Sequence, residues 1–171
     1  MQTRFERLTI LKAPGCAGGC LTAEGKLKMN RYEWLPTESS YENYPMRIIH
    51  GDFIFDDGTS LYIPGRKTID NGWGEMGSIH IVGEKFKPLP TRIEISYFSF
   101  AEDKFYSGVF SLPYEKISNL FREGLRSPIT GEKITYQNII VGVAPAGEIS
   151  IWLMRMVKCG WSPILEPKRK S

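Results

Sequence analysis

Residues 136–157 of this 171-residue chain read YQNIIVGVAPAGEISIWLMRMV. Two runs rich in β-branched and aromatic residues flank a turn at residues 144–147, a pattern typical of a β-hairpin. The second run is apolar at both sets of alternating positions, with Ile149, Ile151 and Leu153 on one face and Trp152, Met154 and Met156 on the other. A strand that is apolar on both faces is usually covered on both sides. The stretch therefore predicts a central hairpin in a layered β-protein.

Two further hairpins are predicted upstream. Residues 45–55 and 59–63 flank the turn Asp56-Asp57-Gly58, and an Asp-Gly pair between alternating apolar residues is a strong hairpin signal. Residues 92–100 alternate between apolar and polar, turn at residues 101–103 and return through residues 104–110. The chain is therefore rich in short antiparallel pairs.

One helix is predicted over about residues 113–124. Pro113 suits the first helical position, Glu115 favours the N-terminal end of the helix dipole, and Gly124 suits the C-terminal cap. Apolar residues recur at helical spacing, namely Tyr114, Ile117, Leu120 and Phe121. We therefore expect a mainly β fold, an antiparallel β-sandwich or strongly bent sheet with one packed α-helix.

The formal net charge of +3 is unevenly distributed. Residues 1–30 carry five basic and two acidic side chains, and residues 168–171 carry three basic ones, so residues 31–167 must carry −3. We expect a leader-like or disordered extension at 1–30, a single β-rich domain at 31–167 and a basic tail at 168–171. A nucleic-acid partner is not expected, because a basic stripe is missing from the domain.

Cys16 follows the small residues of Ala13-Pro14-Gly15, as at the end of a bacterial lipoprotein signal. The apolar segment before it, residues 8–11, is shorter than the roughly 7–15 residues usual for export. Cys16 is a candidate for lipidation and membrane anchoring, which would place the protein in the cell envelope or periplasm; without a working leader it would be cytoplasmic. Cys16 and Cys20 make a weak zinc pair because no second pair or His lies nearby, and neither metal nor cofactor is expected.

Few residues suggest catalysis. His50 and His80, together with Asp52 and the turn residues Asp56 and Asp57, would offer a metal site or an acid–base pair, since imidazole titrates near neutral pH. Both His lie in strand-like sequence, however, and Asp is common in turns for backbone reasons. The chain also lacks a Gly-rich phosphate loop before a helix, a nucleophile elbow and a His-Glu-x-x-His motif. We expect a protein that is not an enzyme, with an enzyme that uses these residues as the alternative.

Aromatic residues are the better candidates for binding. Trp73, between glycines, either plugs the core from a loop or anchors a partner, since Trp is enriched at binding hot spots. The hairpin over residues 97–110 holds more aromatic residues than one face can bury. The candidate partner-binding residues are Trp73, Phe98, Phe100, Phe105 and Tyr106.

Short motifs extend along most of the chain: Tyr44-Pro45-Met46-Arg47, Asn71-Gly72-Trp73-Gly74, Pro88-Leu89-Pro90, Leu112-Pro113-Tyr114 and Val141-Gly142-Val143-Ala144-Pro145. Their order and spacing, over roughly residues 32–161, resemble the bacterial family catalogued as domain of unknown function 2931. Many members of that family look like lipoproteins, and the family has no established activity. Similar genes often occur near toxin-secretion loci, so the resemblance suggests an immunity or inhibitor role.

We therefore expect a non-catalytic bacterial binding protein, an immunity or inhibitor protein that neutralises a secreted toxin. A structural or accessory lipoprotein of the envelope is the alternative from a different class. A mildly acidic domain would suit a basic protein partner. The sequence leaves the oligomeric state open.

Overall fold

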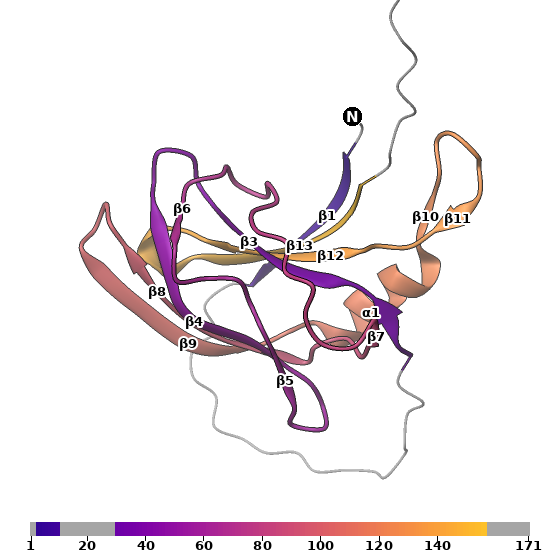
Figure 1. Ribbon diagram of the computed structural model, residues 1–171, viewed down its shortest axis with the longest axis horizontal. Coiled ribbons are helices and arrows are strands. Elements are labelled where there is room, and N and C mark those ends of the chain that lie inside the picture. The colour runs from indigo at the N-terminus through magenta and orange to yellow at the C-terminus, as the bar shows by residue number, and fades with distance from the viewer. Residues whose placement is uncertain (1–2, 11–29, 157–171) are drawn as a thin grey trace, which may run out of the picture.

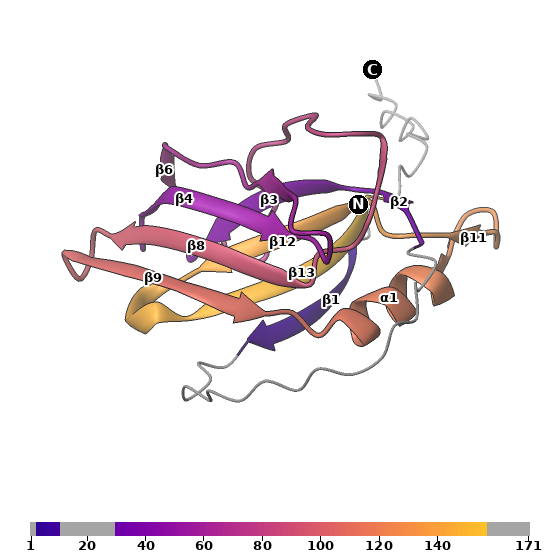
Figure 2. The ribbon, with the colours of Figure 1, turned by 90° about the horizontal axis from the view of Figure 1, so that it is seen from below.

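Two β-sheets stack face to face, and one helix packs at one end of the stack (Figures 1 and 2). The computed structural model describes the backbone of residues 3–10 and the chain from residue 30 to residue 156. Within these ranges the fold is mainly β with a single α-helix, as predicted. No helix in this part of the chain is long and apolar enough to cross a membrane.

The first sheet has four strands in the order β1 (Thr3–Ile10), β13 (Ile149–Met156), β12 (Asn138–Val143) and β3 (Leu35–Ser40). The hairpin predicted over residues 136–157 is confirmed as β12 and β13, joined through the 3-10 turn η1 (Pro145–Gly147). The pairing of β3 with β12 is parallel, whereas the other pairs of this sheet are antiparallel.

The second sheet runs in the order β5 (Ser60–Tyr62), β4 (Met46–Ile54), β8 (Arg92–Ser99) and β9 (Lys104–Ser111), and β6 (Thr68–Ile69) pairs with the start of β4. Both predicted hairpins, β4–β5 and β8–β9, are therefore present. A bulge between Ile48 and His50 shifts the register of β4 against β8.

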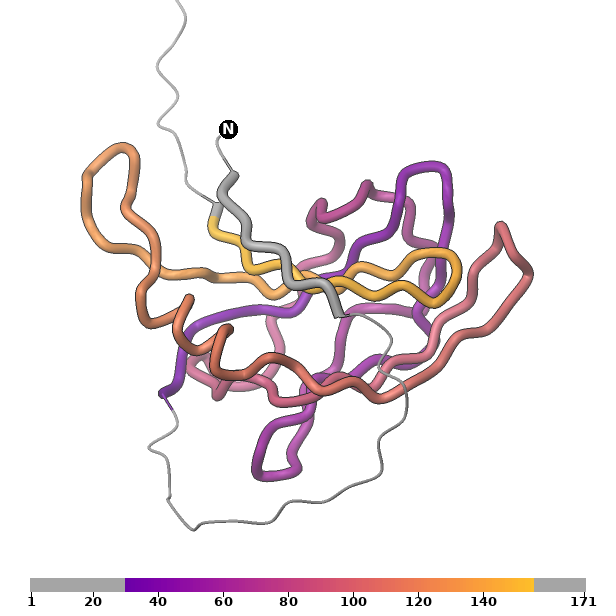
Figure 3. Tube along the Cα trace, turned by 180° about the vertical axis from the view of Figure 1, so that it is seen from behind, coloured from indigo at the N-terminus to yellow at the C-terminus, as the bar shows by residue number. Residues whose placement is uncertain are grey.

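Two short strand pairs lie outside the sheets: β2 (Tyr32–Glu33) with β7 (Phe86–Lys87), and β10 (Leu125–Arg126) with β11 (Lys133–Ile134). The tip of the β8–β9 hairpin and the β10–β11 pair lie at opposite ends of the molecule (Figure 3). The hairpin tip is therefore not covered by the β10–β11 extension.

The predicted helix is α1 (Tyr114–Glu123). Its Ile117 and Phe121 are buried in the core, as the helical spacing predicted. Gly124 ends the helix in the left-handed region (φ 64°), and its N–H donates to the Leu120 carbonyl at 2.8 Å. This residue is the predicted C-terminal cap.

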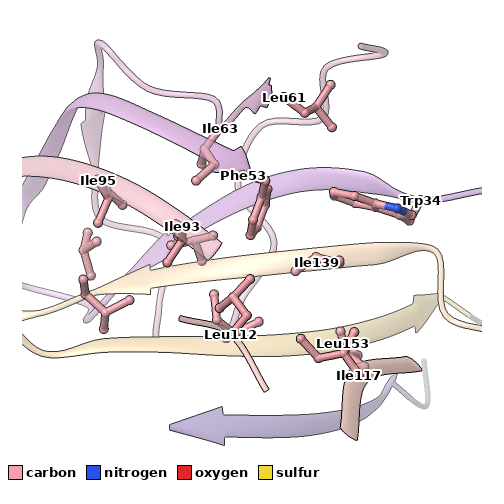
Figure 4. Packing of buried hydrophobic residues seen from close by; sticks show 14 of the residues in the cluster. Trp34, Phe53, Leu61, Ile63, Ile93, Ile95, Leu112, Ile117, Ile139 and Leu153 are labelled. Carbon is pink, nitrogen blue, oxygen red and sulfur yellow. The ribbon is translucent and has the colours of Figure 1, made fainter. Parts of the chain in front are cut away.

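The core lies between the two sheets (Figure 4). The alternation predicted for β8 is confirmed, because Ile93, Ile95 and Tyr97 are all buried. They belong to one core cluster with Phe53 of the same sheet and Ile139 of the first sheet. Tyr97 also links the sheets by a hydrogen bond, since its hydroxyl donates to the Ala144 carbonyl at 2.8 Å.

A smaller cluster covers the outer face of the first sheet. Ile140, Trp152 and Met154 point away from the main core, and Trp73 and Met76 pack over them. Both faces of β13 are thus buried, which is what the doubly apolar pattern of residues 136–157 predicted.

Strands β1 and β3 were not predicted. Residues 3–10, assigned from sequence to an extension outside the domain, pair with β13 over eight positions and so belong to the first sheet. Local sequence patterns do not reveal this pairing, because β13 lies about 140 residues further along the chain than β1. The remainder of the predicted extension, with Cys16 and Cys20, lies outside the described residues, as do Cys159 and the basic tail.

Candidate functional site

Three of the candidate aromatic residues come together on the outer face of the second sheet. Phe98 and Phe105 are cross-strand partners on β8 and β9, with ring centroids 4.7 Å apart. Phe100 meets the Phe98 ring edge-on at 5.0 Å. Phe100 is 44% exposed and Phe105 is 73% exposed. We call Phe98, Phe100 and Phe105 the phenylalanine face.

The phenylalanine face follows directly from strand alternation. Because Ile93, Ile95 and Tyr97 point into the core, Phe98 must point outward. Arg47, the cross-strand neighbour of Phe98 on β4, holds its guanidinium 5.9 Å from the centre of the Phe100 ring. The face is therefore an apolar cluster bordered by a cation.

Tyr106 belongs to the interior rather than to this face. Its ring stacks on Tyr97 with centroids 5.4 Å apart, and its hydroxyl donates to Glu102 at 3.0 Å. Burial and this carboxylate together raise the pKa of Tyr106. The Ala146 N–H also donates to Glu102, at 3.1 Å, which ties the β8–β9 turn to the β12–β13 turn. The surroundings of Tyr106 thus favour a structural role.

Trp73 lies on the opposite side of the molecule, half-buried over the first sheet. It stacks on Tyr41 with ring centroids 4.2 Å apart and meets Trp152 edge-on at 4.8 Å. Its loop is fastened to β3: the Ser39 hydroxyl donates to the Gly72 carbonyl at 2.7 Å and accepts from the Gly74 N–H at 2.8 Å. This packing favours the interpretation of Trp73 as a plug.

Strand β3 contains a buried acid that the sequence did not single out. Glu38 is fully buried, accepts from the Ser78 N–H at 2.8 Å and faces the Lys67 ammonium at 3.0 Å. Its second carboxylate oxygen has no hydrogen-bond partner among the described residues. Glu38 therefore holds the loop over the edge of the sheet.

The two His line one cavity of about 420 Å³. His50 Nε2 lies 3.1 Å from Asp52 Oδ2, and the Tyr62 hydroxyl lies 3.2 Å from His80 Nδ1. Arg66 also lines this cavity. Residues at i and i+2 of a strand share a face, which explains why Asp52, one of the acids considered as a partner of the His, lies beside His50.

Asp56 and Asp57 do not line this cavity. They form the β4–β5 turn, where Asp57 accepts from the Thr59 hydroxyl at 2.6 Å and from the Thr59 N–H at 2.9 Å. These bonds lower the pKa of Asp57. Of the three Asp considered as partners of the His, Asp52 lies beside His50, whereas Asp56 and Asp57 lie in the turn away from this cavity. In the described ranges, no group of three or more His, Cys, Asp or Glu is arranged to hold a metal.

A second cavity, of about 570 Å³, lies under residues 79–85 at the end of the stack. Lys87 lines it and is only 4% exposed. Its ammonium donates to the Trp34 carbonyl at 2.7 Å and lies 5.5 Å from the centre of the Trp34 ring. Burial lowers the pKa of Lys87, and the nearby charge of Glu33 opposes this in part. Sequence pattern missed this site because an isolated Lys carries no periodic signal.

One family model matches the chain, over residues 22–165, and its description is protein of unknown function (DUF2931). No curated protein matches the chain, and no solved structure does. The matched range includes both cavities, the phenylalanine face and every described element except β1.

Proposed function

Since the chain belongs to the DUF2931 family, whose description assigns no activity, we propose a function from its own surface: it is a non-catalytic binding protein with a protein partner. The partner class is a secreted toxin, which the chain neutralises as an immunity protein. The observation that carries the proposal is the phenylalanine face.

Exposed aromatic clusters of this kind are typical of interfaces. Single exposed apolar residues are common on protein surfaces, but contiguous apolar patches usually mark binding sites. Aromatic residues and Arg are enriched in protein–protein interfaces, and Phe100 lies beside Arg47. A partner that covers Phe100 and Phe105 would remove two exposed rings from water.

Charge supports a basic partner. Residues 31–167 carry a formal net charge of −3, and opposite charge on the two surfaces speeds their encounter. A toxin that acts on nucleic acid or on a membrane surface would offer such a basic surface.

The test is co-expression with the toxin encoded by the adjacent gene. Phe100→Ser combined with Phe105→Ser should abolish both protection and co-purification, because the apolar contact is lost while the fold is unaffected. Val109→Ser is the matched control, since Val109 is also exposed on β9 but lies outside the phenylalanine face. Full protection by the double Phe variant, or a neighbouring product that is neither toxic nor bound, would refute the proposal.

The His-lined cavity supports a second candidate, an enzyme that uses acid–base chemistry. In that case His50, oriented by Asp52, would be the base and His80, beside Tyr62, the acid. His50→Ala combined with His80→Ala would then abolish the biological activity. If this variant protects as well as wild type, the enzyme candidate is eliminated.

Lipid anchoring at Cys16 remains a separate proposal from the sequence alone. Cells fed a labelled fatty acid should then label the wild-type chain but not Cys16→Ser. An unlabelled wild-type product in the soluble fraction would contradict anchoring.

A further inference from the structure

The cavity under residues 79–85 combines apolar side chains with charged residues at its mouth. Trp34 and Leu35 form part of its wall, and Val82 packs against the main core. Ile79 and Ile81 also line it, and Ile81 is 91% exposed. A ligand would therefore find apolar surface both inside the cavity and at its mouth, where the two exposed isoleucines lie.

Lys87 is the buried cation of this cavity, and it forms no ion pair with any residue that the structure describes. Among the described residues, no carboxylate lies within 4.0 Å of its ammonium, and the only hydrogen bond recorded for that group is the one to Trp34. An ammonium has three N–H donors, so donors remain for a ligand. A buried charge is costly unless it is paired, which makes an anion the expected complement.

The carboxylates at the mouth are engaged elsewhere. Glu33 lies 3.8 Å from Lys85, and Glu84 lies 2.6 Å from Arg31. Glu33 and Glu84 thus pair with exposed basic residues at the mouth, while the buried Lys87 ammonium can pair with an anionic ligand.

We propose that this cavity binds an aliphatic carboxylate, with the acid head on Lys87 and the chain against Leu35, Ile79 and Ile81. The volume of about 570 Å³ is within the range of pockets for small organic ligands. The site is separate from the phenylalanine face, which is formed by β8, β9 and the turn between them.

The probe is decanoate, titrated into the full-length chain by calorimetry, with 1-decanol as the uncharged analogue. We expect one decanoate per chain. Lys87→Met should weaken decanoate binding at least tenfold but leave 1-decanol binding within about twofold, because only the acid head loses its partner. Lys116→Met, an exposed Lys on α1, is the matched control and should bind decanoate as wild type does.

Ile81→Asp provides a second variant that keeps Lys87. Ile81 is almost fully exposed, so the fold should tolerate the change, while a carboxylate at the mouth should weaken decanoate binding severalfold. The Phe100→Ser, Phe105→Ser double variant should bind decanoate normally, which separates this site from the proposed partner interface. The proposal is overturned if wild type does not bind decanoate, if Lys87→Met binds it equally well, or if a folded Lys87→Met loses both probes equally.

Discussion

Lys87 is a residue whose burial works against stability. A buried ammonium without a carboxylate partner loses hydration, and replacing such charges by apolar groups of similar shape is often neutral or stabilising. Its one hydrogen bond, to the Trp34 carbonyl, recovers only part of that cost. A residue that costs stability but lines a cavity fits a binding role, because binding sites commonly sacrifice stability for function.

This argument predicts that Lys87→Met raises the free energy of unfolding by about 1 kcal/mol at pH 7. The folded-state pKa of Lys87 is lowered below its ordinary value of 10.5, so between the two values the unfolded chain binds more protons. Wild-type stability should therefore rise with pH across that window, and the advantage of Met should shrink toward pH 10.5. Urea unfolding at several pH values measures this, with Lys116→Met as the control. A loss of stability at pH 7 would show that the bond to Trp34 outweighs the burial cost.

Among the elements, β12 carries a glycine, Gly142, on which the Trp152 and Trp73 rings pack closely at the outer face of the first sheet. A Cβ added at Gly142 would lie 2.6 Å from Trp152 Cη2 and 2.8 Å from Trp73 Cζ3. Gly142→Ala should therefore displace both indoles and cost about 1–3 kcal/mol, the usual cost of overpacking. Near-UV circular dichroism and urea unfolding measure the two effects.

Val143→Ala is the control for this prediction. Val143 faces the inner core, so its truncation should lower stability without changing the near-UV signal of the indoles. If Gly142→Ala leaves both the near-UV signal and the stability unchanged, the Trp73 ring can move away from Gly142 without cost, and the prediction is wrong.

The elements that sequence predicts are those encoded locally. The three hairpins and α1 carry turn signals and periodicity within about 20 residues, whereas β3 has no apolar pattern. Thr37, Glu38, Ser39 and Ser40 are nevertheless fully buried, because their polar groups bond to the loop over residues 69–78, far along the chain. The candidate sites divide in the same way. Strand alternation predicts that some Phe residues of the β8–β9 hairpin point out of the core. No local pattern indicates that Lys87 is buried or that His50 and His80 line one cavity.

At the scale of the whole molecule, the first sheet has two edges that are protected differently. The loop of Trp73 covers β3 through side-chain hydrogen bonds, while β1 occupies the other edge beside β13. Cleavage of a lipoprotein signal before Cys16 would remove residues 3–10 and expose β13. Lipid anchoring at Cys16 and a first sheet that includes β1 are therefore mutually exclusive states of the chain.

The consequence of losing β1 is testable with a chain that begins at residue 16. β13 would then be an unpaired edge that is apolar on both faces, and such edges pair with other chains. We expect lower resistance to urea and concentration-dependent self-association in size-exclusion chromatography. The control keeps residues 1–15 and replaces residues 21–28 by Gly and Ser. A truncated chain that stays monomeric and as stable as wild type would show that the fold does not need β1. Only in that case would cleavage before Cys16 leave a stable domain.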